Sequence, residues 1–194
     1  MSKKTFFIIP GFKQRVSSEP FAWLVKFLKQ RGFEVVEVPV TWDRHTNTEC
    51  AKDFQDFYRK RKSKKNYILG FSYGAVIAFI SATVLRPEKL YLCSLSPDFR
   101  EDLSYMKPWI KKDLGKKRIA DVKQRSGRGI AKMLRMPITI FYGEKEARRY
   151  PALKIRCEET AQLAKDARVV IIKNAPHDIH YPSYEAAIKK EIRA

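Results

Sequence analysis

Nineteen consecutive uncharged residues, YILGFSYGAVIAFISATVL at positions 67–85, decide the fold of this chain. Charged residues make up 31% of the whole sequence, so an uncharged run of this length stands out. Its length approaches the roughly twenty apolar residues of a transmembrane helix. However, Gly70 and Gly74 interrupt the run, and the three residues before Gly70 are typical of a short strand. We therefore predict a strand, a sharp turn and a buried helix over residues 73–85, and no membrane span.

Apolar runs and amphipathic segments alternate along nearly the whole sequence on either side of this stretch. Strands are predicted over residues 5–9, 33–40, 66–69, 89–95, 138–142 and 168–172. Helices are predicted between Ser18, as the N-cap, and Gly32, and over about 50–61, 73–85, 151–167 and 183–192. The predicted fold class is α/β: a three-layer sandwich with a mainly parallel six-stranded sheet and helices on both faces.

The pentapeptide Gly70-Phe71-Ser72-Tyr73-Gly74 lies at the predicted turn and matches the pattern G-x-S-x-G. A turn this tight holds the serine in a strained backbone conformation, and side chains at the two glycine positions would collide with neighbouring elements. The serine hydroxyl then projects above the sheet at the N-terminus of a buried helix, where free N–H groups and the helix dipole favour negative charge. We interpret Ser72 as a nucleophile; a tight turn without chemistry is the alternative.

The motif and the order of elements resemble the α/β-hydrolase superfamily over nearly the full chain. The chain is similar to a small, minimal member that starts at the first parallel strand and lacks the N-terminal antiparallel hairpin. The resemblance implies a single domain over residues 1–194, serine hydrolase chemistry without a cofactor, and Ser72 as the nucleophile. One basic segment, at about residues 99–135, departs from the alternation, and we expect it to form an insertion or short cap over one end of the sheet.

A serine nucleophile needs a base, and the sequence offers three histidines. The resemblance implies His177, which follows the last predicted strand, as the general base. His180 is close enough in the sequence to be the alternative base, and the choice between the two rests on position alone. The other interpretation of His180 is a surface residue or a residue at the entry to the last helix. His45 is expected to be structural or to line the pocket with Trp42. His177 and His180 have the spacing of a metal pair, but no third ligand is evident, so no metal is expected.

A carboxylate should orient the histidine and stabilise its cation. The resemblance places this acid after the penultimate strand, where Glu146 stands at the position usually held by aspartate. Glu144 has the wrong spacing. Asp98, after the preceding strand, is the alternative acid, and a solvated loop charge is the alternative interpretation of Glu146.

Two N–H donors should stabilise the oxyanion of the reaction. The resemblance implies the backbone of Tyr73, directly after the nucleophile, and that of Phe12, in the loop after the first strand. Gly11 would allow the backbone to approach closely, and Pro10 replaces the histidine that is common in the family.

The composition of the chain limits which cellular compartment and which binding partners we expect. The formal net charge of +19, from 40 basic and 21 acidic residues, attracts anions. The three cysteines match no metal motif, and five apolar residues near the N-terminus are too few for a secretory signal, so a cytoplasmic protein is expected. The basic run at 59–65 is interpreted as a solvated helix end, with nucleic-acid binding as the less favoured alternative. The segment 99–135 either steers an acidic or phosphate-bearing ester towards Ser72 or carries generic charge.

These observations leave two hypotheses for the function. The favoured one is a serine hydrolase that cleaves a carboxylic ester or related small acyl compound through Ser72, His177 and Glu146. The alternative is a catalytically silent protein of the same fold that binds an anionic partner, either nucleic acid or an acidic ligand.

Overall fold

One six-stranded sheet lies at the centre of the computed structural model, which describes residues 3–192. All neighbouring strands are parallel, in the order β2-β1-β3-β4-β5-β6. The predicted α/β fold with six parallel strands is confirmed. The strands are β1 (Lys4–Ile9), β2 (Glu34–Glu37), β3 (Lys65–Phe71), β4 (Lys89–Cys93), β5 (Ile138–Gly143) and β6 (Ala167–Ile172).

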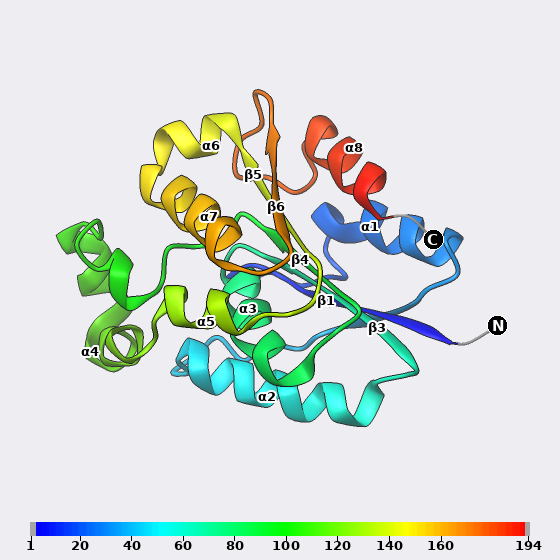
Figure 1. Ribbon diagram of the computed structural model, residues 1–194, viewed down its shortest axis with the longest axis horizontal. Helices are drawn as coiled ribbons and strands as arrows, with labels where there is room; N and C mark the ends of the chain where they lie inside the picture. The colour runs from blue at the N-terminus through cyan, green and yellow to red at the C-terminus, as the bar shows by residue number, and fades with distance from the viewer. Residues whose placement is uncertain (1–2, 193–194) are drawn as a thin grey trace.

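Helices cover both faces of this sheet (Figure 1). Helices α1 and α8 pack on one face, whereas α2, α3, α5 and α7 pack on the other. The helices are α1 (Glu19–Gln30), α2 (Asn47–Arg61), α3 (Tyr73–Leu85), α4 (Pro108–Gln124), α5 (Gly127–Met133), α6 (Glu144–Arg149), α7 (Pro151–Leu163) and α8 (Pro182–Glu191), with a short 3-10 helix η1 (Arg100–Asp102).

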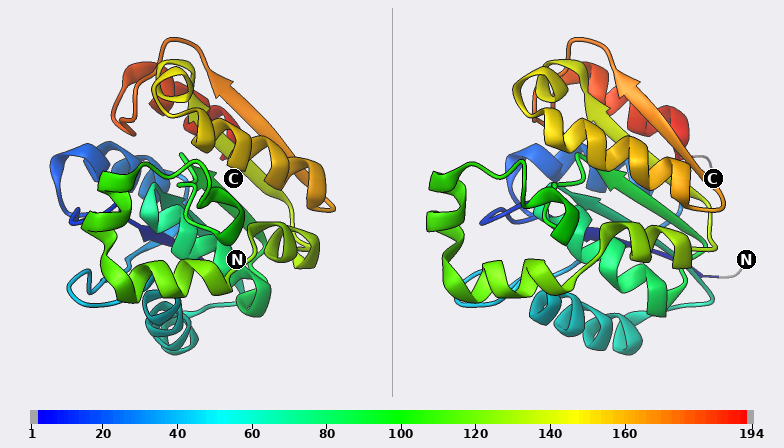
Figure 2. Two further views of the ribbon diagram at one scale, coloured as in Figure 1. Left: turned by 90° about the vertical axis from the view of Figure 1, so that its left-hand side faces the viewer. Right: turned by 60° about the vertical axis from the view of Figure 1, so that its left-hand side comes forward.

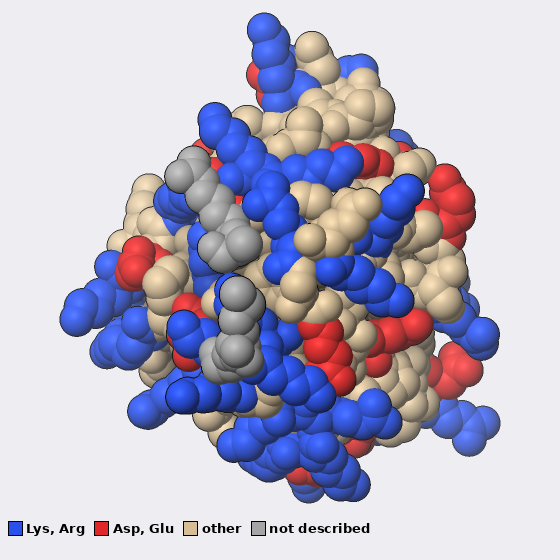
Figure 3. Space-filling view, turned by 90° about the vertical axis from the view of Figure 1, so that its right-hand side faces the viewer, with Lys and Arg blue, Asp and Glu red and all other residues tan. Residues whose placement is uncertain are grey.

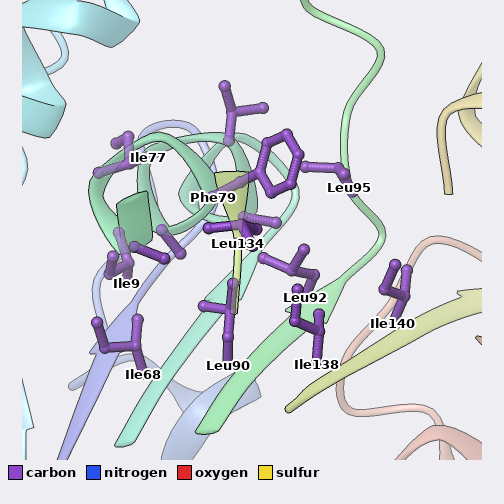
Figure 4. Close-up of a cluster of buried hydrophobic side chains, with 14 of the residues drawn as sticks. Ile9, Ile68, Ile77, Phe79, Leu90, Leu92, Leu95, Leu134, Ile138 and Ile140 are labelled. Atoms are coloured by element: carbon purple, nitrogen blue, oxygen red, sulfur yellow. The ribbon is translucent and has the colours of Figure 1, made fainter. Parts of the chain in front are cut away.

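The strands are apolar on both sides because both sides are covered. Successive side chains of a strand point to opposite faces. In β1, Phe6 and Ile8 join the core beneath α1 and α8, while Phe7 and Ile9 join the core beneath α2 and α3. Figure 4 shows the second core, whose labelled side chains include Ile9, Ile68, Leu90, Ile77 and Phe79.

The uncharged run at 67–85 forms the end of β3 and the whole of α3, with Ser72 between them. Helix α3 has 13 residues and lies buried between α2 and the sheet. Among residues 3–192, no helix combines the length and the apolar character that crossing a bilayer requires.

Several predicted element bounds are wrong, among them the end of β4, which is Cys93 and not residue 95. Strand β2 covers only part of the predicted 33–40, because it is an edge strand that pairs with β1 alone, over four residues. Helix α7 stops short of the predicted end at 167, because Ala164 is extended (ψ 145°) and β6 begins at residue 167. Ser18 is the N-cap residue of α1 as predicted, but its side chain makes no capping bond, because the hydroxyl donates to the carbonyl of Arg15.

Helix α2 begins earlier than the predicted residue 50, and the reason is a capping box. The Thr46 side chain accepts from the Glu49 N–H at 3.2 Å, and the Glu49 carboxylate accepts from the Thr46 N–H at 2.7 Å. This reciprocal pair starts the helix at Asn47.

The segment 99–135 contains η1, α4 and α5. Helix α4 lies on the side of the molecule opposite the N-terminus (Figure 1), and Figure 2 shows it standing out from the body. It is kinked at Gly115, which has φ 73°. The Arg118 guanidinium donates to the carbonyls of His45 and Trp42, and so ties α4 to the loop that follows β2.

Lys and Arg side chains cover much of the face on the right-hand side of Figure 1, as Figure 3 shows. This face carries the chain termini and the start of β3, so it lies away from α4. The basic run at 59–65 ends α2 and leads into β3.

Candidate active site

Ser72 joins β3 to α3 in a strained conformation. Its φ of 56° and ψ of −121° place an L-residue in a backbone region that side chains rarely adopt. Its N–H donates to the carbonyl of Cys93 at 2.9 Å, and its carbonyl accepts from Ala75 at 2.9 Å. These bonds hold the turn in place and leave the hydroxyl at the N-terminal end of α3.

The two glycines of the motif are required by close backbone approach. A Cβ on Gly70 would lie 2.2 Å from the carbonyl oxygen of Gly74. A Cβ on Gly74 would lie 2.3 Å from the carbonyl oxygen of Ile9 and 2.4 Å from that of Pro10. Both contacts are with backbone, which cannot move aside as a flexible side chain does, so the turn admits no other residue at either position.

His177 lies between Ser72 and Glu146. It stands in the loop after β6, with 36% of its side chain exposed, and its Nε2 is 3.1 Å from the Ser72 hydroxyl oxygen. Its Nδ1 contacts Oε1 of Glu146. The ring packs against Phe71, with the two centroids 4.9 Å apart. The structure therefore brings together the three residues that the sequence singled out as nucleophile, base and acid.

Glu146 is buried, with 2% of the residue exposed. It belongs to α6, a short helix that the sequence analysis did not predict, and this helix begins directly after β5. Its Oε2 accepts from the Gly143 N–H at 3.1 Å and from the Ser94 hydroxyl at 2.8 Å. These two donors fix the carboxylate so that Oε1 faces the imidazole.

Sequence reasoning missed the hydroxyl groups around this carboxylate and this serine. The Ser94 hydroxyl, besides donating to Glu146, lies 2.9 Å from the Tyr184 hydroxyl. The Ser96 hydroxyl lies 3.5 Å from that of Ser72. The sequence did contain a signal for these hydroxyls. Ser94 and Ser96 come just after β4, and the carboxyl ends of parallel strands meet at one edge of the sheet, where Ser72 also lies.

Solved structures resemble the chain over nearly its whole length, although no family model and no curated protein matches it. Est1E from Butyrivibrio proteoclasticus with ferulic acid bound superimposes with a TM-score of 0.79 at 14% identity, over 98% of this chain and 86% of that one. The Pyrococcus furiosus esterase Pf2001 gives a TM-score of 0.71 at 14% identity, over 98% and 79%. MGS-MChE2, an alpha/beta hydrolase from a lagoon-sediment metagenome, gives 0.72 at 16% identity, over 97% and 89%. The chain has the α/β-hydrolase fold.

The other residues predicted in this α/β-hydrolase fold have different partners. Oδ2 of Asp98, the alternative acid, accepts from the Asn47 side chain and lies 3.9 Å from the Arg125 guanidinium. Burial raises the pKa of Asp98 to about 6, against the opposing effect of Arg125. Both ring nitrogens of His177 already contact Ser72 and Glu146, so neither is left for Asp98.

His180, the alternative base, stands at the entry to α8. Its Nε2 lies 3.0 Å from Oε1 of Glu19, and its Nδ1 lies 2.8 Å from Oε1 of Glu185. Carboxylates occupy both nitrogens, so His180 does not face Ser72. Among residues 3–192, no group of three or more His, Cys, Asp or Glu side chains is arranged to hold a metal ion.

The two predicted oxyanion residues lie side by side. The rings of Phe12 and Tyr73 have centroids 5.7 Å apart, and both line a cavity of about 310 Å³. His45 and Trp42 line the same cavity. Ser72 and His177 do not line this cavity, and Tyr73, the residue after Ser72, connects it to the turn. Helix α4 contributes lining residues that include Trp109 and Leu114.

Proposed function

We propose that the protein is a serine hydrolase that cleaves a carboxylic ester or a related small acyl compound. The observation that carries this proposal is the continuous chain from the Ser72 hydroxyl through the His177 ring to the buried Glu146 carboxylate. A hydroxyl is a weak nucleophile at neutral pH, and an imidazole within hydrogen-bond distance is the usual activator.

In the first half of the reaction, the Ser72 oxygen attacks the ester carbonyl while Nε2 of His177 takes the hydroxyl proton. The C–O bond to the leaving alcohol then breaks, and Nε2 returns the proton to the alcohol oxygen. An acyl group remains bound to Ser72.

In the second half, His177 takes a proton from a water molecule as the water oxygen attacks the acyl carbonyl. The bond to the Ser72 oxygen breaks, the proton returns to that oxygen, and the carboxylic acid leaves. Each half restores the imidazole, so the cycle consumes one water and produces one acid and one alcohol.

Glu146 acts through His177. Its Oε1 accepts a hydrogen bond from the Nδ1–H, which keeps Nε2 unprotonated and aimed at the serine, and its negative charge stabilises the imidazolium that forms. Glutamate serves here because α6 begins directly after β5 and the backbone N–H of Gly143 holds the second oxygen.

The tetrahedral intermediate carries a negative oxygen. The N–H of Tyr73, the first residue of α3, is one proposed donor, and the helix dipole adds to its effect. The N–H of Phe12 is the other proposed donor, from the loop that follows β1.

The segment 99–135 is proposed to be a short cap over this site. Helix α4 contributes one wall of the cavity that Phe12 and Tyr73 also line. A cavity of about 310 Å³ is at the small end for ligand pockets and fits a small substrate rather than a long acyl chain. The esterase among the similar structures and the acid bound to Est1E support ester chemistry.

The proposal is tested with a fluorophosphonate probe and short p-nitrophenyl esters. The wild-type protein should be labelled at Ser72 and hydrolyse the esters, and Ser72→Ala and His177→Ala should lose both activities. His180→Ala is the matched control, since it removes the neighbouring histidine, and it should retain them. The proposal fails if the wild-type protein is neither labelled nor active on any ester, or if Ser72→Ala is as active as the wild type.

A further inference from the structure

The cavity beside Ser72 contains a polar atom whose hydrogen bonding is incomplete. Asp98 lines the cavity with only 3% of the residue exposed. Oδ2 of this carboxylate is occupied by the side chain of Asn47, whereas Oδ1 has no hydrogen-bond partner among residues 3–192. A buried carboxylate oxygen without a donor is costly, and Oδ1 is itself covered, so a small shift of the Asp98 side chain towards the cavity would let a ligand supply the missing donor.

The rest of the lining favours a flat apolar group. Phe12, Trp42, Tyr73 and Trp109 supply four aromatic side chains, and the rings of Phe12 and Trp42 meet edge to face with centroids 5.5 Å apart. Aromatic surfaces favour another ring in stacked or edge-on contact. Trp109, on α4, is 60% exposed, so one aromatic wall is open to a ligand.

The charges around Asp98 favour a neutral donor over a cation. Arg125, which does not line the cavity, lies 3.9 Å from Oδ2 and already balances the charge of Asp98, and Arg118 lines the cavity itself. An ammonium group is therefore not needed to neutralise Asp98 and would meet the Arg118 guanidinium. The chain as a whole carries a net charge of +19.

The lining of the cavity does not favour a negatively charged ligand either. Asp98 shares the lining with Asp113 and Asp121. The Arg118 guanidinium is already engaged, because it donates to the backbone carbonyls of His45 and Trp42. The donor that fits Oδ1 is therefore an uncharged hydroxyl.

We propose that this cavity is the specificity pocket of the hydrolase, and that it selects an aromatic group bearing a neutral hydroxyl, which donates a hydrogen bond to Oδ1 of Asp98. The inference rests on the proposed function in that it makes the cavity the substrate's binding site. It deepens that function by naming a substrate class, the hydroxyaryl esters, and one residue that recognises it.

Binding is measured first, in the Ser72→Ala protein, so that no turnover occurs. The probes are methyl 4-hydroxybenzoate, its 3-hydroxy isomer, and methyl 4-methylbenzoate, in which a methyl group replaces the hydroxyl. Methyl 4-hydroxycyclohexanecarboxylate keeps the hydroxyl without the flat ring. The readouts are calorimetry and the fluorescence of Trp42 and Trp109, two of the three tryptophans, both of which line the cavity.

At pH 7, at least one hydroxybenzoate should bind about tenfold or more tightly than the methyl and cyclohexane analogues, as expected for one hydrogen bond to a charged acceptor. Asp98→Asn should abolish this preference, because the new amide keeps an acceptor for Asn47 and presents N–H to the cavity. Asp56→Asn is the control, since Asp56 lies on the exposed side of α2, paired with Arg59. Equal affinity for the matched esters overturns the proposal, and this comparison needs no variant at Asp98.

Hydrolysis of the same esters separates the two proposals. Turnover without any preference for the hydroxyl leaves the serine hydrolase standing and overturns the pocket assignment. Asp98-dependent binding of the hydroxybenzoates, without turnover or probe labelling in the wild-type protein, supports the pocket and overturns the hydrolase.

Discussion

The hydroxyl of Ser94 donates a 2.8 Å hydrogen bond to the buried carboxylate of Glu146, fifty-two residues further along the chain. Ser94 itself has φ 54° and lies at the end of β4. The bond fixes the orientation of a carboxylate whose other oxygen contacts His177. Ser94 is thus proposed as a positioning residue, which acts on the imidazole through Glu146.

Replacing Ser94 by alanine should lower kcat about tenfold with little change in KM, since Oε2 of Glu146 loses one of its two donors while the substrate pocket is untouched. Steady-state kinetics on a p-nitrophenyl ester measure this split. Ser81→Ala is the control: its hydroxyl is also buried, and it donates to the Ala51 carbonyl on the other side of α3. Equal kcat values for Ser94→Ala and the wild type would contradict the positioning role.

Replacing Glu146 by glutamine should lower kcat by a factor of about 10³ to 10⁴, because an amide cannot stabilise the imidazolium and favours the wrong tautomer. Glu144→Gln supplies the comparison from the same helix, as Glu144 accepts from the Asn174 N–H and pairs with Arg148. It should keep kcat within about twofold. A larger loss in Asp98→Asn than in Glu146→Gln, on an ester without a hydroxyl, would reassign the acid.

Asp98 should make the free energy of unfolding depend on pH. Its pKa is raised from 3.8 to about 6 in the folded protein, so the folded state binds the proton more tightly. Stability from this group is therefore present below pH 4 and is lost as the pH rises through 6. Asp98→Asn removes the effect, and its free energy of unfolding relative to the wild type should rise by about 2–3 kcal/mol between pH 4 and pH 7.

Urea unfolding at several pH values measures this difference, with Asp56→Asn as the exposed counterpart. A difference between Asp98→Asn and the wild type that stays constant across this range would show that Asp98 is not perturbed.

Gly74→Ala should lower both stability and activity, because the new Cβ meets the carbonyl oxygens of Ile9 and Pro10 at 2.3 and 2.4 Å. Separating α3 from the loop after β1 should cost about 3 kcal/mol or more. Gly129→Ala tests the same substitution where the nearest atoms, in Ser126, are 3.4 Å away, and it should be neutral or slightly stabilising. Thermal unfolding measures both, and equal melting temperatures would refute the steric argument.

Local patterns predicted the fold and the turn that holds Ser72, because those features depend on short-range chemistry. The glycines of the motif and the apolar runs of the strands are visible in the sequence, and α3 has the predicted bounds. Helix α6 was missed because it has six residues and no apolar periodicity. The end of β2 was misjudged because only the single neighbour of an edge strand sets its length.

The cavity was beyond sequence analysis for a different reason. Its walls come from the loops after β1, β2 and β4, from the starts of α2 and α3, and from α4. No local sequence pattern specifies the position of α4 relative to the sheet. Few of its side chains are buried, and a kink at Gly115 changes the direction of the helix. The unpartnered oxygen of Asp98 is visible only once the positions of Asn47 and Arg125 are known.

The three central residues follow β3, β5 and β6, so they emerge during synthesis in the order serine, carboxylate, imidazole. Under the proposed mechanism, a partly synthesised chain exposes a kinked serine with nothing to deprotonate it. Reactivity appears only when β6, an edge strand, joins the sheet and its loop swings the imidazole over the serine. Under this mechanism the order of the strands itself keeps the serine unreactive until the last strand has joined the sheet.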